Sequence, residues 1–255
     1  MARIFITGST EGLGRGAALA LLDNGHQVVL HARNPSRAGS LGDLAHRASA
    51  VVVGDLASGE ETHGVAAQVN AIGRMDAVIH NAGIYTDRQR VATPEGHART
   101  LAVNVLAPYV LTAQIERPAR LVYLSSGMHR GGDPSLQDVD WVSRRWDGVQ
   151  AYSDSKLFVT ALAYWVALRW PAVRSNAVDP GWVPTRMGGP SAPDDLALGH
   201  ATQVWLAVSN EPDATGSGGY WHHQQRQAPA PAVTDMGFQD ALVDVLTRLT
   251  GVHLS

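Results

Sequence analysis

Two side chains capable of proton transfer stand one helical turn apart in the segment Tyr152-Ser153-Asp154-Ser155-Lys156. Residues at i and i+4 of a helix project from the same face, so a helix here would set the Tyr152 phenol beside the Lys156 ammonium. A nearby positive charge lowers the pKa of a phenol from its usual value of about 10. The pair therefore suits general acid–base chemistry, although this spacing also occurs often by chance.

Lys156 is the sole lysine of the chain, since the other 19 of its 20 basic residues are arginine. This composition indicates a coding background that favours arginine. If position were indifferent, the lysine would fall here about once in twenty, so its retention favours a function that a planar guanidinium cannot perform. Coincidence is the alternative.

A glycine-rich segment, Thr7-Gly8-Ser9-Thr10-Glu11-Gly12-Leu13-Gly14, follows the first strand-like run and opens a helical pattern. Free backbone amides at such a helix start can hold a dinucleotide pyrophosphate. Gly8 would make the turn, and Gly12 and Gly14 would allow close backbone approach. A plain tight loop between strand and helix would use glycine in the same way, so this motif does not decide the matter alone.

Together these motifs resemble the short-chain dehydrogenase/reductase family, and the resemblance covers nearly the whole sequence. The G-x-x-x-G-x-G spacing, rather than G-x-G-x-x-G, is similar to that family's. Ser126 is favoured over Ser125 because the first serine usually continues the strand. The other segments that carry the resemblance are Asp55-Leu56, His80-Asn81-Ala82-Gly83, Val103-Asn104-Val105 and Asp179-Pro180-Gly181-Trp182-Val183-Pro184-Thr185.

The resemblance implies a catalytic set of Asn104, Ser126, Tyr152 and Lys156. Tyr152 would exchange a proton with the substrate oxygen, and Ser126 would hydrogen-bond that oxygen. Lys156 would lower the pKa of the phenol and hold ribose hydroxyls of the cofactor, and Asn104 would anchor a water that extends the proton path. The implied activity is reversible hydride transfer between a nicotinamide cofactor and a carbonyl compound or secondary alcohol.

It also implies a cofactor site along the carboxyl ends of the strands. Asn81 would tie the sheet together, the small Ala82 would leave room for the adenosine ribose, and the backbone near Pro180 with Thr185 would contact the nicotinamide carboxamide. The full implied set is Gly8, Thr10, Gly12, Leu13, Gly14, Arg33, Asp55, Leu56, Asn81, Ala82, Gly83, Tyr152, Lys156, Pro180, Gly181, Val183 and Thr185.

The end of the second strand decides the cofactor, because an acid there would bind the ribose 2′-hydroxyl and an arginine would pair with a 2′-phosphate. The family's usual acidic position is Ala32 here, and Arg33 follows it. The sequence therefore predicts NADP(H) over NAD(H). Glu11 departs from this pattern, because many NADP-preferring members have a basic residue before the second glycine.

Within the family, the chain resembles the retinol dehydrogenase and protochlorophyllide reductase-like branch. The 26-residue gap from Ser126 to Tyr152 and the segment Ser217-Gly218-Gly219-Tyr220-Trp221 carry this likeness. The stretch from Thr112 to Pro118 is shorter than that branch's usual helix end. This departure argues against assigning the retinoid or pigment substrates of that branch to this chain.

The elements that must position these residues alternate between strand-like and helical patterns, which predicts a doubly wound parallel α/β sheet with helices on both faces. Expected strands are 3–7, 27–32, 50–53, 77–80, 120–124 and 173–178. Expected helices are 12–22, 37–48, 60–72, 95–114, 150–170, 194–209 and 237–250, with loops at 127–147 and 224–234.

Composition excludes several classes. The 20 basic and 23 acidic residues give a net charge of −3, and no cationic block marks a nucleic-acid or membrane surface. Cysteine is absent and the histidines form no ligand cluster, so no disulfide or metal site is expected. The N-terminus lacks signal-peptide features and no apolar stretch has membrane-spanning length, so a cytoplasmic protein is expected.

We expect a single domain over 1–255, with a substrate loop around 182–200 and a C-terminal segment over 217–255. The helix from Leu157 to Leu168 is apolar around most of its circumference, which predicts a homodimer or homotetramer. A non-catalytic NADP-binding sensor or scaffold is the alternative, and the intact Ser126, Tyr152 and Lys156 argue against it. A sugar-nucleotide epimerase would need a larger C-terminal substrate domain.

Overall fold

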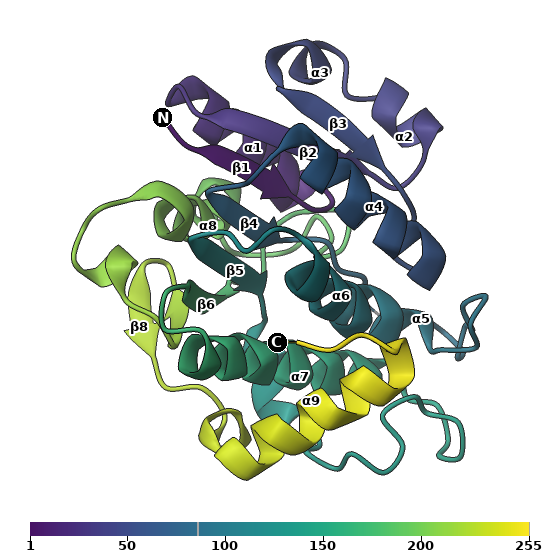
Figure 1. Cartoon of the computed structure of the whole chain (residues 1–255). Helices are drawn as coiled ribbons and strands as arrows, with labels where there is room; N and C mark the ends of the chain where they lie inside the picture. The colour runs from purple at the N-terminus through teal and green to yellow at the C-terminus, as the bar shows by residue number, and fades with distance from the viewer. Residues whose placement is uncertain (86, 255) are drawn as a thin grey trace.

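The computed structural model describes residues 1–85 and 87–254 and contains one eight-stranded sheet with helices on both faces (Figure 1). The strand order is β3-β2-β1-β4-β5-β6-β7-β8, which confirms the predicted doubly wound fold. The order reverses between β1 and β4, where such sheets bind ligands. The strands are β1 (Arg3–Ile6), β2 (Gln27–Ala32), β3 (Ala50–Val53), β4 (Ala77–His80), β5 (Arg120–Leu124), β6 (Arg174–Asp179), β7 (Gly219–His222) and β8 (Gln225–Gln227).

The last two strands are a correction. Strands β1 to β6 lie at the predicted positions within one residue, but β7 and β8 were not expected, and β8 falls in the predicted loop 224–234. β7 pairs with β6 in parallel and β8 turns back against it. The three residues of β8 are polar and exposed, so β8 lacks the apolar run by which the other strands are found.

Five helices begin and end within two residues of the predicted positions: α1 (Gly12–Asp23), α4 (Gly59–Ile72), α7 (Gly148–Arg169), α8 (Leu196–Val208) and α9 (Met236–Thr250). Their caps agree with the sequence. Asp147 caps α7 by accepting hydrogen bonds from the amides of Val149 and Gln150, and Asp235 caps α9 in the same way. The long helix that carries Tyr152 and Lys156 is thus fixed at its start.

Two predicted helices are wrong in detail. The expected helix 37–48 is two short ones, α2 (Pro35–Gly39) and α3 (Asp43–Arg47), separated at Gly42 with φ of 55°. The expected helix 95–114 begins later, as α5 (Arg99–Leu101), a π-helical turn (Ala102–Leu106) and α6 (Ala107–Gln114). Residues 93–97 form a turn instead, in which the amide of Thr93 donates to the carbonyl of His97 at 2.8 Å and Gly96 has a φ of 91°, outside the helical region.

Two apolar layers enclose the sheet. The layer on one face packs β-strand side chains against α1 and α8, and the layer on the other packs them against α4, α6, α7 and α9. Both layers leave the carboxyl ends of the strands free to carry loops. The loops after β1, β2, β4, β5 and β6 therefore gather at one edge, where the expected site residues lie.

Helix α9 lies along α7, as Figure 1 shows in yellow and green. Asp240 of α9 accepts a hydrogen bond from Trp165 Nε1 at 2.8 Å and pairs with Arg169 at 2.7 Å. Tyr109 of α6 donates to the carbonyl of Val252 beyond α9, 2.9 Å away. Most of the apolar surface of α7 from which a homo-oligomer was expected is thus buried within the chain, with Leu168 left 52% exposed, so this helix argues for one only weakly.

Within the described residues, no helix is long and apolar enough to cross a bilayer. In the same part of the chain, no group of three or more histidine or acidic side chains is placed to hold a metal ion.

Candidate active site

The Tyr152 phenol and the Ser126 hydroxyl form the centre of the site. Ser126 follows the end of β5, and its Oγ accepts from the amide of Met128 at 3.2 Å. Burial raises the pKa of Tyr152 on α7 to about 12, and the neighbouring Ser126 side chain acts in the opposite direction. Ser125 is buried and bonded to Thr160 at 2.6 Å, so the structure places the second serine beside the phenol, as expected.

Lys156 lies beneath the phenol, one helical turn on. Its side chain is 4% exposed, Nζ donates to the carbonyl of Leu124 at 2.8 Å, and Nζ lies 5.5 Å from the centroid of the Tyr152 ring. Burial lowers the pKa of Lys156 to about 8. An ammonium has three donors, so two remain for other partners.

Asn104 lies in the π-helical turn, an irregularity frequent at functional sites. Its amide bonds both backbone groups of Ile84, at 2.9 and 3.0 Å, and donates to Ser155 at 2.9 Å. A Cβ placed on Gly83 would lie 3.4 Å from Asn104 Oδ1 and 3.4 Å from Lys156 Nζ. The side chains of Asn104 and Lys156 thus border the same space over Gly83. Asn104 also fixes Ile84, the residue after Gly83, through its two backbone bonds.

The glycine-rich segment needs glycine at two positions for reasons the structure makes explicit. Gly8 has φ of 63°, and a Cβ there would lie 3.0 Å from Ala82 Cα. Gly12 has φ of 54°, and its Cβ would lie 3.3 Å from Thr185 Cγ2. These left-handed conformations favour glycine. The segment therefore contacts both the loop after β4 and the loop after β6, as the cofactor site requires.

Asn81 links the first and fourth strands. Its Nδ2 donates to the carbonyls of Thr7 and Gly8, at 2.9 and 3.1 Å. The amide of Ala82 donates to Thr7 Oγ1 at 2.9 Å. A Cβ on Gly14 would collide with the Asn81 amide. Asn81 thus joins the loop after β4 to the start of the glycine-rich segment.

The loop after β6 approaches from the other side of the sheet's reversal point. Val183 is buried against Gly199 of α8, where Leu13 also packs, and Thr185 accepts a hydrogen bond from the amide of Gly188 at 3.2 Å. Trp182, in contrast, is 57% exposed. In the expected substrate loop 182–200, Val183 and Thr185 therefore pack near the glycine-rich segment, whereas the Trp182 ring is exposed.

Comparison with known proteins agrees with this geometry. A family model described as enoyl-(acyl carrier protein) reductase, of the adh_short_C2 group, matches residues 8–208. The short-chain dehydrogenase chry4 of Gibberella zeae is 38% identical over 258 residues, covering 100% of this chain and 99% of that protein. The chain belongs to the short-chain dehydrogenase/reductase family.

Two further matches refine the placement. Human retinol dehydrogenase 13 is 27% identical, and the match covers 98% of this chain and 85% of that protein. The likeness to the retinol dehydrogenase branch is thus present at lower identity. The crystal structure of an uncharacterized protein from Mycobacterium Paratuberculosis superposes with a TM-score of 0.84 at 24% identity, covering 100% of this chain and 95% of that one. This last match shows the short-chain dehydrogenase/reductase fold alone.

His31 is a site residue that the sequence reasoning missed. It is buried at the carboxyl end of β2, its Nδ1 accepts from the amide of Gly8 at 2.9 Å, and its Nε2 faces the carbonyl of Gly54 at 2.9 Å. Accepting at Nδ1 leaves Nε2 to donate, so the ring is neutral, and burial lowers its pKa. His31 thus holds the turn of the glycine-rich segment, and only the register of β1 with β2 identifies it.

Arg37 is a second residue beside the glycine-rich segment that the sequence reasoning did not find. Its guanidinium pairs with Glu11 at 2.7 Å and donates to Thr10 Oγ1 at 3.2 Å. Asn34 starts α2 by accepting from the amide of Arg37, which turns the arginine toward the glycine-rich segment. Arg33, the residue after β2, is exposed. Nearby, Asp55 caps its own loop by accepting from the amide of Ala57, and Leu56 is buried.

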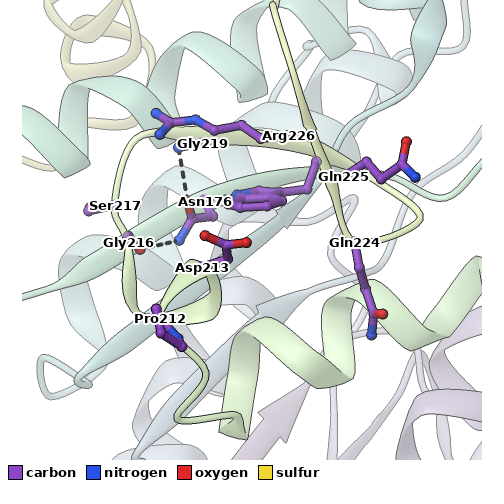
Figure 2. A pocket seen from close by; sticks show the side chains of 10 residues that line it. Asn176, Pro212, Asp213, Gly216, Ser217, Gly219, Gln224, Gln225 and Arg226 are labelled. Atoms are coloured by element: carbon purple, nitrogen blue, oxygen red, sulfur yellow. Dashed lines mark hydrogen bonds between the residues drawn. The ribbon is translucent and has the colours of Figure 1, made fainter.

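Two cavities lie away from Ser126, Tyr152 and Lys156. A cavity of about 300 Å³ borders Leu56 and the ends of α4, α6 and α9. Figure 2 shows a larger one, of about 450 Å³, beside Asn176, whose amide bonds the backbones of Gly216 and Gly219 at 2.9 Å each. None of the expected site residues lines it. Its lining is Asn176, Pro212, Asp213, Gly216, Ser217, Gly219, Trp221, Gln224, Gln225 and Arg226.

Proposed function

We propose that this protein is an NADP(H)-preferring oxidoreductase that interconverts a carbonyl compound and a secondary alcohol, with Tyr152 as general acid and base. The observation that carries the proposal is the buried Lys156 ammonium 5.5 Å from the ring of Tyr152, with Ser126 close enough to lower the pKa of the phenol. A structural cluster alone does not account for a buried lysine that lies at the edge of a sheet and, within residues 1–85 and 87–254, uses one of its three donors.

The residues present fit a nicotinamide dinucleotide. Gly8 and Gly12 leave a bare backbone at the start of α1, where amides and the helix dipole favour a pyrophosphate. Gly83 leaves open the space bordered by Asn104 and Lys156. When bound, the cofactor supplies or accepts the hydride, and the protein supplies position and charge.

In the reducing direction, the Tyr152 hydroxyl donates its proton to the substrate oxygen as the carbonyl carbon becomes that of an alcohol. Ser126 donates a hydrogen bond to the same oxygen and stabilises the developing negative charge. The phenolate that remains is stabilised by the Lys156 ammonium and regains a proton from solvent. In the oxidising direction the phenolate removes the alcohol proton, so each form of Tyr152 serves one direction.

The preference for NADP(H) is supported by two guanidinium groups at one corner. Arg33 follows β2 directly, and Arg37 is held against Thr10 of the glycine-rich segment. The pairing of Arg37 with Glu11 offsets the acid that departed from the expected pattern. Arginine binds phosphate oxygens in a bidentate way, so this corner suits a 2′-phosphate better than a free hydroxyl.

A panel of ketones and aldehydes, followed by the loss of NADPH absorbance, tests the proposal. Turnover by the parent chain and none by Tyr152→Phe is the expected result. Cofactor binding without turnover of any compound would favour the non-catalytic sensor. A homodimer or homotetramer stays a prediction, and sedimentation of the full chain measures the oligomeric state. The cytoplasmic location also stays a prediction. Because α9 packs along α7, the apolar helix on which the oligomer was predicted is now mostly buried within the chain.

A further inference from the structure

Asp179 places a carboxylate at the middle of the edge where the catalytic side chains meet. It ends β6, which pairs with β5 up to Leu124, and the amide of Ser125 donates to the carbonyl of Val178 at 2.7 Å. On its other side, Asp179 is in register with His222 of β7. A Cβ placed on Gly127 would lie 3.2 Å from its Oδ2. The carboxylate therefore lies directly behind the loop that carries Ser126.

Two hydrogen bonds, one to each oxygen, fix this carboxylate. Oδ1 accepts from the amide of Gly181 at 3.0 Å, and Oδ2 accepts from the Tyr220 hydroxyl at 3.0 Å. Tyr220 is fully buried and packs against the ring of His129, with centroids 4.5 Å apart. Because both donors are themselves held, the carboxylate cannot rotate away from the site, and it holds the Pro180-Gly181 turn in place.

The charge of Asp179 is weakly compensated. In the described part of the chain, its one ion pair is with His222 Nδ1, 3.8 Å from Oδ2, which is ionic only when that ring is protonated. The side chain is 14% exposed, so solvent screens it little. The charged and titratable groups around it are Tyr152 and Lys156 of α7, His129 and Arg130 of the turn after β5, Tyr220 and His222 of β7, His223 beyond β7, and Asp194 of the loop after β6.

This negative charge acts on both members of the catalytic pair. After burial and the Ser126 side chain, Asp179 is the next influence on Tyr152, and it raises the pKa of the phenol. On Lys156 it opposes the effect of burial and raises the pKa of the ammonium. Both effects favour the protonated states.

We propose that Asp179 is a positioning residue, whose bonds fix the Gly181 turn and whose charge keeps the proton on Tyr152. The inference rests on the proposed function and deepens it. A protonated phenol is the form that reduces a carbonyl, and the phenolate is the form that oxidises an alcohol. Asp179 thus moves the onset of alcohol oxidation to higher pH and extends carbonyl reduction over a wider pH range, without changing the equilibrium of the reaction.

The variant Asp179→Asn tests the charge, because an amide of nearly the same shape can still accept from Gly181. We expect the midpoints of the pH profiles of kcat/KM, rising for oxidation and falling for reduction, to move to lower pH by about one unit. Asp244→Asn, which neutralises an exposed acid on the outer side of α9, is the control, and it should leave both midpoints in place.

An Asp179→Asn enzyme that loses rate equally at every pH, with unmoved midpoints, would show a purely structural role and overturn the proposal. A readout without substrate separates this failure from failure of the proposed function. The alkaline rise of tyrosinate absorbance, with the Tyr152→Phe signal subtracted, should begin at lower pH in Asp179→Asn. If that curve does not move, the proposal is wrong whatever compounds the enzyme accepts. Should circular dichroism show Asp179→Asn to be unfolded, Asp179→Ser is measured in its place.

Discussion

The guanidinium of Arg37 lies 2.7 Å from the carboxylate of Glu11, and the same nitrogen donates to Thr10 Oγ1 at 3.2 Å. Taken alone, an acid at position 11 would repel a 2′-phosphate. Taken with its partner, it holds a cation above the glycine-rich segment, close to the end of β2 where Arg33 follows. Because both side chains of this ion pair are partly exposed, its contribution to stability is small and its value lies in placement.

Arg37→Ala should raise the KM for NADPH about tenfold and leave that for NADH nearly unchanged, since one charge-assisted bond to the 2′-phosphate is lost. Arg33→Ala should act in the same direction, and Ala32→Asp should reverse the preference by placing an acid at the ribose. Titration with both cofactors measures this. Arg47→Ala, which removes a pair with Asp23 at the far end of α1, is the control. Equal losses for the two cofactors would contradict the assignment.

Tyr152→Phe should leave cofactor affinity nearly intact and lower kcat by at least about 10³-fold, because the phenol proton is deleted while the ring is kept. The ring has a packing role of its own: it lies edge-on to Tyr85, with centroids 4.7 Å apart. Cofactor titration and turnover are measured on the same preparation. A variant that reduces any true substrate near the parental rate would show that another group donates the proton.

The positions of strands β1 to β6 and the pairing of Tyr152 with Lys156 could be predicted because they depend on local patterns. Apolar runs mark strands, and four residues make one helical turn. Arg37 and His31 could not, because their roles depend on contacts far along the chain. His31 reaches Gly8 only through the register of β1 with β2, and Arg37 faces Thr10 only because Asn34 sets where α2 starts.

The covering of α7 by α9 is a further case. The sequence shows correctly that α7 is apolar on most sides, but the identity of what covers it is not a local property. An apolar helix face can be buried by a second copy of the chain or by a later segment of the same chain. The composition of the helix is the same in the two cases. Here Asp240 of α9 bonds both Trp165 and Arg169, and this pairing links residues more than 70 positions apart.

Acidification should destabilise the fold through His80. Its ring is buried and stacked on Tyr123 with centroids 4.7 Å apart, and burial lowers its pKa to about 3. Since the unfolded chain binds this proton at about pH 6.5 and the folded chain only near 3, the contribution of the ring is complete above about 6.5 and is lost as pH falls between these values. Between these pH values, the free energy of unfolding should fall by about 1.4 kcal/mol per pH unit for each buried histidine of this kind.

Urea unfolding at several pH values between about 7 and 4 measures this slope. His80→Gln should flatten it, while His253→Gln, which changes an exposed residue near the chain end, should not. His31 has its pKa lowered for the same reason and adds to the total. An unfolding free energy that stays constant over this range would show that the buried rings take up protons without unfolding.

Lys156→Arg keeps the formal charge and should still lower kcat by roughly 10²-fold, since a misplaced group of this kind costs about that much. The ammonium fits between Leu124, whose carbonyl it bonds at 2.8 Å, and Gly83, whose Cβ position lies 3.4 Å away. A guanidinium is longer and planar, so it cannot enter this space without displacing the backbone, and its charge is spread away from the phenol. The pKa of Tyr152 should then rise, and the onset of alcohol oxidation should move to higher pH.

The matched control for this exchange is Arg169→Lys on the same helix, where the exposed pair with Asp240 tolerates either cation. It should leave kcat and the pH profile unchanged. In a chain whose other 19 cationic positions are arginine, Lys156→Arg is the substitution that composition makes most natural, and its loss of activity would explain why lysine is retained. An arginine enzyme with the parental rate and an unmoved pH profile would reduce the single lysine to coincidence.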